Sequence, residues 1–100
     1  MSDCFASLFS LDEVRDYVHH KLCRREGLSE QVCPQCEKPL LQQGKACGLH
    51  FSVHGPRHVR PNAIWVFAEN AIYFYDSRGE RFLKVLLRYR FEMGAEAAAA

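Results

Sequence analysis

Residues 63–75 read A-I-W-V-F-A-E-N-A-I-Y-F-Y, and the expected fold is built outward from these two apolar segments. Residues 63–68 are continuously apolar, which is typical of a central strand of a sheet. Glu69 and Asn70 follow as a two-residue turn, because Asn tolerates a positive φ. Residues 71–75 then return as a second apolar strand. The stretch therefore predicts an antiparallel hairpin in the middle of a sheet.

Further strands are expected on both sides of this hairpin. Residues 40–43 and 46–53 flank a turn at Gly44-Lys45, which predicts a hairpin on the N-terminal side. A turn at residues 76–79 leads to a last strand over about 81–91. Its alternation places one set of apolar side chains on a single face, namely Leu83, Val85, Leu87, Tyr89 and Phe91. Together these segments predict an antiparallel meander of about five strands over about 39–91.

A helix is predicted near the N-terminus, at about 11–26. Ser10 and Glu13 have the spacing of a capping box, and Phe9 stands where a hydrophobic staple would contact Val14. Gly27 suits the left-handed conformation that ends a helix. Apolar residues recur along one side of this segment: Leu11, Val14, Tyr17, Val18 and Leu22.

The fold class expected from these elements is α+β, with the N-terminal helix packed on the meander in two layers. Residues 1–93 form one domain, and residues 94–100 form a low-complexity tail. Five strands span roughly 19 Å, whereas one helix is about 10 Å wide. Either the sheet curls around the helix or a second chain covers the rest, and we expect a homodimer.

Composition limits the partners and the cellular compartment that can be expected for the protein. The formal net charge of the 100-residue chain is +1, so no bulk charge points to nucleic acid or membrane. The sequence has no secretory signal pattern and no apolar run of the ~18 residues that a membrane span needs. Five Cys is an odd number, and reduced thiols are the default in a cytoplasm. We expect a soluble cytoplasmic protein.

Cys33, Cys36, Cys47 and His50 form the pattern C-x2-C-x10-C-x2-H, which is a plausible spacing for zinc ligands. The eight residues C-P-Q-C-E-K-P-L at 33–40 resemble the first knuckle of zinc ribbons. This resemblance implies a zinc-containing ribbon-like binding module that contacts nucleic acid or protein. The pattern departs from zinc ribbons because the second pair is Cys and His.

The same residues have two other interpretations. Side chains alternate along a strand, so Cys47 and His50 point to opposite faces unless a bulge near Gly48 intervenes. Cys47 lies in phase with Leu49, which favours packing on the apolar face. The C-P-x-C string is also similar to a glutaredoxin-type dithiol, which implies a thiol–disulfide active protein using Cys33 and Cys36.

A binding face is expected on the second side of the sheet. Tyr73 and Tyr75 fall there with Lys84, Arg88 and Arg90, and aromatics interleaved with Arg are typical of single-stranded nucleic-acid binding. The low net charge favours a dimer interface instead. A compact loop adds a second group of polar residues that could bind anions: His54, Arg57 and His58.

No phosphate-binding glycine loop, nucleophile elbow or H-E-x-x-H motif is present. The sequence therefore leans away from an enzyme. The interpretation it favours is a small non-enzymatic interaction or accessory domain, acting as a homodimer or on another protein. The zinc module and the thiol–disulfide protein remain the alternatives.

Overall fold

The computed structural model describes residues 2–88, so Tyr89, Arg90, Phe91 and the tail at 94–100 lie outside the described residues. One long helix and six strands make up the described chain, together with one short 3-10 helix. In chain order they are β1 (Ser2–Ala6), α1 (Leu11–Glu26), β2 (Gln35–Gln42), β3 (Lys45–Val53), η1 (Pro56–His58), β4 (Asn62–Val66), β5 (Ala71–Tyr75) and β6 (Arg81–Leu87).

The strands form one six-stranded sheet in the order β1-β6-β5-β4-β3-β2. Strands β2 to β6 pair antiparallel with their neighbours in sequence, so the predicted five-stranded meander is confirmed. The sequence reading missed β1, which pairs in parallel with β6 at the edge of the sheet. The fold is therefore α+β, with six strands instead of five.

Helix α1 has the predicted bounds because local signals fix both of its ends. The Ser10 side chain accepts a hydrogen bond from the Glu13 backbone N–H at 3.2 Å. Gly27 ends the helix at φ 69°, and the Leu28 N–H reaches the Cys23 carbonyl at 2.8 Å. The expected staple residue Phe9 is 61% exposed.

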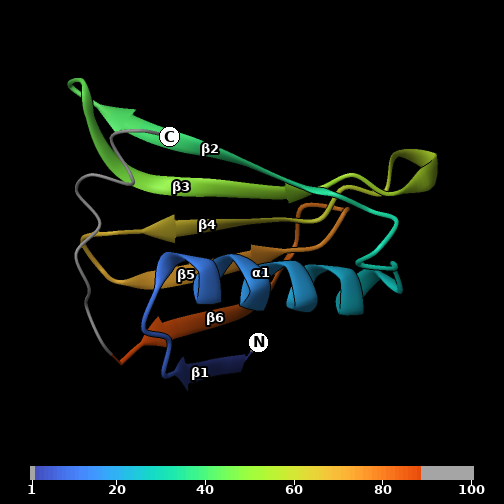
Figure 1. Ribbon diagram of the computed structural model, residues 1–100, viewed down its shortest axis with the longest axis horizontal. Helices are drawn as coiled ribbons and strands as arrows, with labels where there is room; N and C mark the ends of the chain where they lie inside the picture. Colours follow the sequence, from blue (N-terminus) through green and yellow to red (C-terminus); the bar gives the residue numbers. More distant parts are fainter. Residues whose placement is uncertain (1, 89–100) are drawn as a thin grey trace.

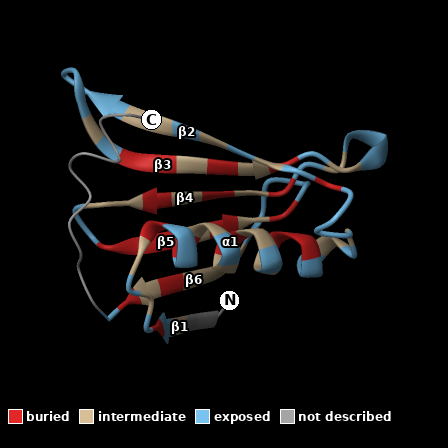
Figure 2. Cartoon of the chain, in the orientation of Figure 1, coloured by how far each residue is buried: buried red, intermediate tan, exposed pale blue. Residues whose placement is uncertain are grey.

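The core lies between α1 and one face of the sheet. Helix α1 crosses in front of the middle strands, and strands β2 and β1 extend beyond it on either side (Figure 1). Buried segments of β3, β4 and β5 lie beneath and beside it (Figure 2). The largest fully buried side chains of this layer include Trp65, Phe51, Phe74, Leu22 and Leu49. No helix or strand among the described residues packs on the opposite face of the sheet.

The β2–β3 hairpin differs from its predicted form in the position of its turn and in the length of β2. Its turn lies at Gln43 and Gly44, which both have positive φ, one residue earlier than expected. Strand β2 begins at Gln35 because its pairing with β3 extends to Val53. The tip of the hairpin extends past the helix and is exposed (Figures 1 and 2). Among the described residues, no helix is long and apolar enough to cross a membrane.

Candidate functional site

The candidate site is the sheet face opposite α1, which we call the outer face. Strand pairing arranges its side chains in three rows that cross the sheet. The first row is apolar and contains one residue from each of the six strands: Leu40, Gly48, Val66, Ala71, Leu86 and Phe5. None of these residues belongs to the core under α1.

The residues of this apolar row differ in exposure. Gly48 and Ala71 are buried, Leu40, Val66 and Leu86 are half-buried, and Phe5 is 62% exposed. The Arg88 guanidinium lies 5.3 Å from the centre of the Phe5 ring, at the edge of the sheet. A contiguous apolar row on one face of a small protein is typical of an interaction surface.

The second row is mixed, and Tyr73 lies at its centre. It runs through Lys38, His50, Ile64, Tyr73 and Lys84. Arg81 and Lys84 place their charges 5.2 and 5.3 Å from the centre of the Tyr73 ring. The Tyr73 hydroxyl donates a hydrogen bond to Glu69, which raises the pKa of Tyr73. The ring is thus already engaged by charged groups of its own chain.

The third row is polar and lies at the opposite end of the strands. It runs through Cys36, Ser52, Asn62, Tyr75 and Arg81. Beyond it, the loop at η1 carries His54, Arg57 and His58, all exposed. Arg57 and His58 have positive φ values of 58° and 64°.

The structure therefore separates the residues of the predicted binding face. Tyr73 and Tyr75 do share the outer face, as expected from strand alternation. Arg88 follows β6 at the apolar end of the strands, whereas the His54–His58 loop lies at the polar end. These groups do not converge on one pocket. Arg90 lies outside the described residues.

The structure brings together only two of the four residues of the zinc pattern, because Cys36 and His50 lie on neighbouring strands in adjacent rows of the outer face. Cys36 pairs across from Ser52, and Cys47 lies five residues before Ser52 on β3, about 16 Å along the strand. Cys33 is buried, and Cys36 and Cys47 are exposed. Within residues 2–88, no three His, Cys, Asp or Glu side chains are placed to hold a metal ion. Cys47 is exposed, so its expected packing on the apolar face is wrong. A β-bulge lies here, because the pairing shifts from Leu40–Gly48 to Leu41–Ala46 and takes Cys47 out of the strand alternation.

The thiols of the C-P-Q-C string have different surroundings. Cys33 belongs to the core, where its carbonyl is 2.8 Å from His19 Nε2. Cys36 lies within strand β2 and not in the first turn of a helix, the position that would lower the pKa of a thiol. Burial raises the pKa of the neighbouring Cys23 thiol, helped by the charges of Glu30 and Cys33. The cysteines of the described chain are free thiols.

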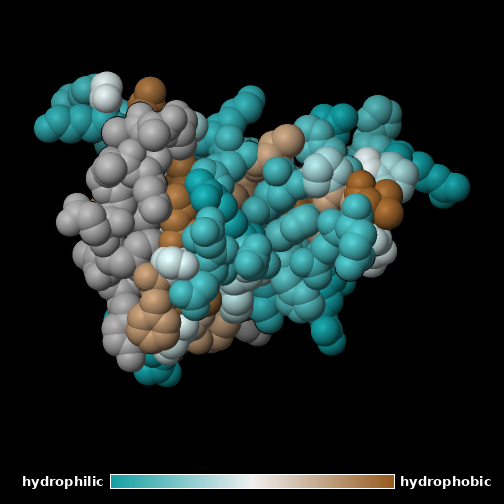
Figure 3. Space-filling model, viewed as in Figure 1, coloured by the Kyte–Doolittle hydropathy of each residue, from teal (hydrophilic) through white to brown (hydrophobic). Residues whose placement is uncertain are grey.

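The helix side of the molecule contrasts with the outer face. The surface over α1 is mostly hydrophilic (Figure 3).

One sequence signal could have revealed the apolar row. Residues 63–68 are apolar at every position, which indicates a strand with apolar side chains on both faces.

Comparison of the chain with protein-family models, with curated proteins and with solved structures found no match.

Proposed function

We propose that the protein is a small non-enzymatic interaction domain that pairs with a second copy of itself through the outer face. The apolar row across all six strands is the observation that carries this proposal. Within residues 2–88, helix α1 packs only on the other side of the sheet. Packing this row against an identical row removes it from water, which is the main driving force for association.

The area available for such a pairing is small. Five gaps between strands of ~4.8 Å span about 24 Å, and one row of residues is about 7 Å deep along the strands. The apolar row therefore offers a footprint of roughly 170 Å² on each chain. This footprint is below that of a standard interface, so we expect weak self-association.

Charge favours one arrangement of the two copies. A two-fold axis along the apolar row lets each residue of the row meet its own counterpart. The second rows, with Lys38 and Lys84, then fall on opposite sides of the seam and do not face each other. Like charges across an interface are costly, so this arrangement avoids the main repulsion that the outer face offers.

Two substitutions on β4 test the proposal. Val66 lies in the apolar row and Asn62 in the polar row, and both side chains are half-buried on the same strand. We expect Val66→Lys to weaken self-association at least tenfold, because it places an unpaired charge in the apolar seam. Asn62→Lys adds the same charge outside the seam and serves as the matched control.

The readout is the molar mass from light scattering across a concentration series. Circular dichroism shows that each variant is folded. An Asn62→Lys protein that dissociates as readily as Val66→Lys would mean that net charge, and not the apolar row, governs association. An unchanged Val66→Lys dimer would place the interface elsewhere.

A further inference from the structure

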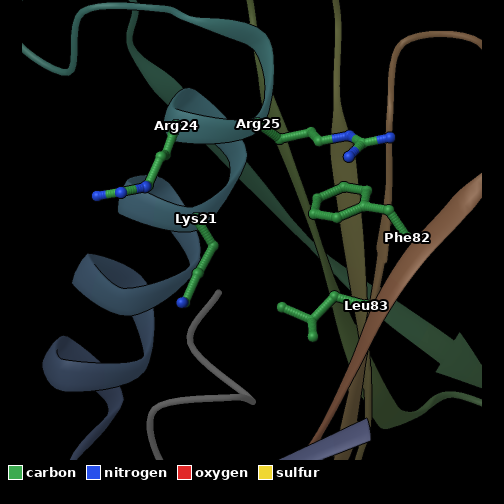
Figure 4. Close-up of a pocket in the computed structure, with 5 residues that line it drawn as sticks. All are labelled: Lys21, Arg24, Arg25, Phe82 and Leu83. Carbon is green, nitrogen blue, oxygen red and sulfur yellow. The ribbon is translucent and has the colours of Figure 1, made fainter. Parts of the chain in front are cut away.

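A groove on the helix side lies where α1 leaves β6 uncovered. It has a volume of about 370 Å³ and is lined by Lys21, Arg24, Arg25, Phe82 and Leu83. Phe82 and Leu83 are half-buried and point from β6 toward the helix (Figure 4). A groove of this size matches the lower end of small-molecule sites.

The cationic side comes from the C-terminal half of α1. Arg25 extends over the Phe82 ring, with its guanidinium 4.8 Å from the ring centre, and Lys21 lies one turn earlier on the helix wall of the groove (Figure 4). Arg24 extends outward at the rim (Figure 4). The groove thus joins an apolar floor to a positively charged wall.

The nearby carboxylates neutralise only part of this charge. The Arg25 guanidinium lies 3.6 Å from Asp76 Oδ2, and its five N–H donors leave room for a second acceptor. Lys21 Nζ lies 5.5 Å from the Tyr17 ring centre, and neither Lys21 nor Arg24 forms an ion pair within residues 2–88. Cations near a helix C-terminus complement its dipole, but that role does not require the half-buried apolar floor.

We propose that this groove binds a free small anion with an apolar body, whose phosphate or carboxylate head lies at Lys21 and Arg25. The apolar body packs on Phe82 and Leu83. Arg24 adds long-range attraction at the rim. The groove is on the opposite side of the sheet from the self-association face, so the two sites are independent.

Titration of the full chain with octyl phosphate below its micelle concentration tests the proposal, with amide chemical shifts as readout. We expect saturable shifts at Phe82 and Leu83. Inorganic phosphate and octanol each carry only part of the ligand and should bind more weakly. Lys21→Glu should weaken octyl phosphate binding about tenfold or more, because it replaces an attraction by a repulsion. Lys45→Glu, at the distant hairpin tip, makes the same charge change and should leave binding unaltered.

No saturable shift at Phe82 and Leu83 up to about 10 mM octyl phosphate would overturn the proposal. If Lys21→Glu and Lys45→Glu weakened binding equally, binding would depend on the net charge of the protein and not on the groove, and the proposal would also be overturned. Co-sedimentation with phosphatidic acid vesicles that octyl phosphate does not compete away would assign the groove to a lipid surface instead of a free ligand. The titration should be repeated with Val66→Lys, which weakens self-association through the outer face. Octyl phosphate should still bind this variant, because the groove lies on the other side of the sheet.

Discussion

Single residues of the core and turns hold the sheet and helix together. Trp65 is 2% exposed, and its ring centre lies 5.1 Å from that of Phe67 in an edge-on contact. Its Nε1–H donates to the Asn70 side chain at 3.3 Å, so the turn after β4 is tied to the strand. Asn70 has φ 50°, which Asn tolerates better than most residues. The apolar β4 stretch thus places one large side chain at the centre of the core.

Trp65→Ala should lower the free energy of unfolding by about 3–5 kcal/mol, because it opens a cavity in the core. Ile64→Ala changes the adjacent residue, which lies half-buried on the outer face. In dilute protein, Ile64→Ala should lower the free energy of unfolding by less than Trp65→Ala does. Urea unfolding measures both, and equal losses would contradict the placement of these two side chains on opposite faces.

Asp76 makes stability depend on acid pH. Burial alone would raise the pKa of Asp76, but N–H bonds from Glu80 and Arg78 to Oδ1, at 3.1 and 3.0 Å, lower it below its usual range. A lowered folded pKa stabilises the protein above the unfolded value of about 3.9 and loses this effect as the pH falls through the folded pKa. Asp76→Asn should therefore be less stable than the wild type at pH 7.

The stability gap between wild type and Asp76→Asn should narrow as the pH falls from about 5 toward 2. Urea midpoints at each pH measure it. Other carboxylates titrate in both proteins and cancel in the difference. A gap that stays constant over this range would show that the Asp76 charge does not stabilise the turn.

At the scale of elements, a charged contact fastens the outermost strand to the helix. Arg15 on α1 makes two bonds to Glu37 on β2, Nε to Oε1 at 2.7 Å and Nη2 to Oε2 at 3.0 Å. The Glu37 side chain is 18% exposed and that of Arg15 is 39% exposed. Such bidentate pairs combine energy with fixed geometry. The contact compensates for the lack of apolar cover over β2.

Glu37→Gln should lower the free energy of unfolding by about 1–2 kcal/mol, less than a fully buried pair would because solvent screens Arg15. Asp12→Asn removes the exposed partner of the same Arg15, at 3.0 Å, and should cost under about 0.5 kcal/mol. Thermal and urea unfolding give both values. The assignment fails if the Asp12 variant loses as much stability as the Glu37 variant.

The elements differ in how far sequence determines them. Helix α1 could be predicted to the residue because Ser10 and Gly27 act locally. Strand β1 could not, because its five residues form a strand only by pairing with β6, some eighty positions later. Residues 35–38 look like a cysteine loop, yet they are strand because β3 extends opposite them. The zinc pattern failed as a guide to proximity because spacing along the chain does not encode register.

At the scale of the whole molecule, α1 covers one face of the sheet, and the other face of the described sheet carries an apolar row beside polar and charged rows. The width argument from sequence anticipated this imbalance, and the structure describes α1 on one side only. The tyrosines of the outer face were predictable from strand alternation. The apolar row was not recognised, because its residues come from six strands and align only once the register is known.

Sedimentation equilibrium of the unmodified full chain, under reducing conditions, measures whether two copies pair through the outer face. Self-association through the outer face predicts a mass that rises from 11.5 kDa in dilute solution toward twice that value as the concentration approaches about 1 mM. A reversible two-state fit with a single dissociation constant would support an isologous pair. A mass that stays at 11.5 kDa up to about 1 mM would show that the outer face does not pair with a second copy, because no dimer would then form at any accessible concentration.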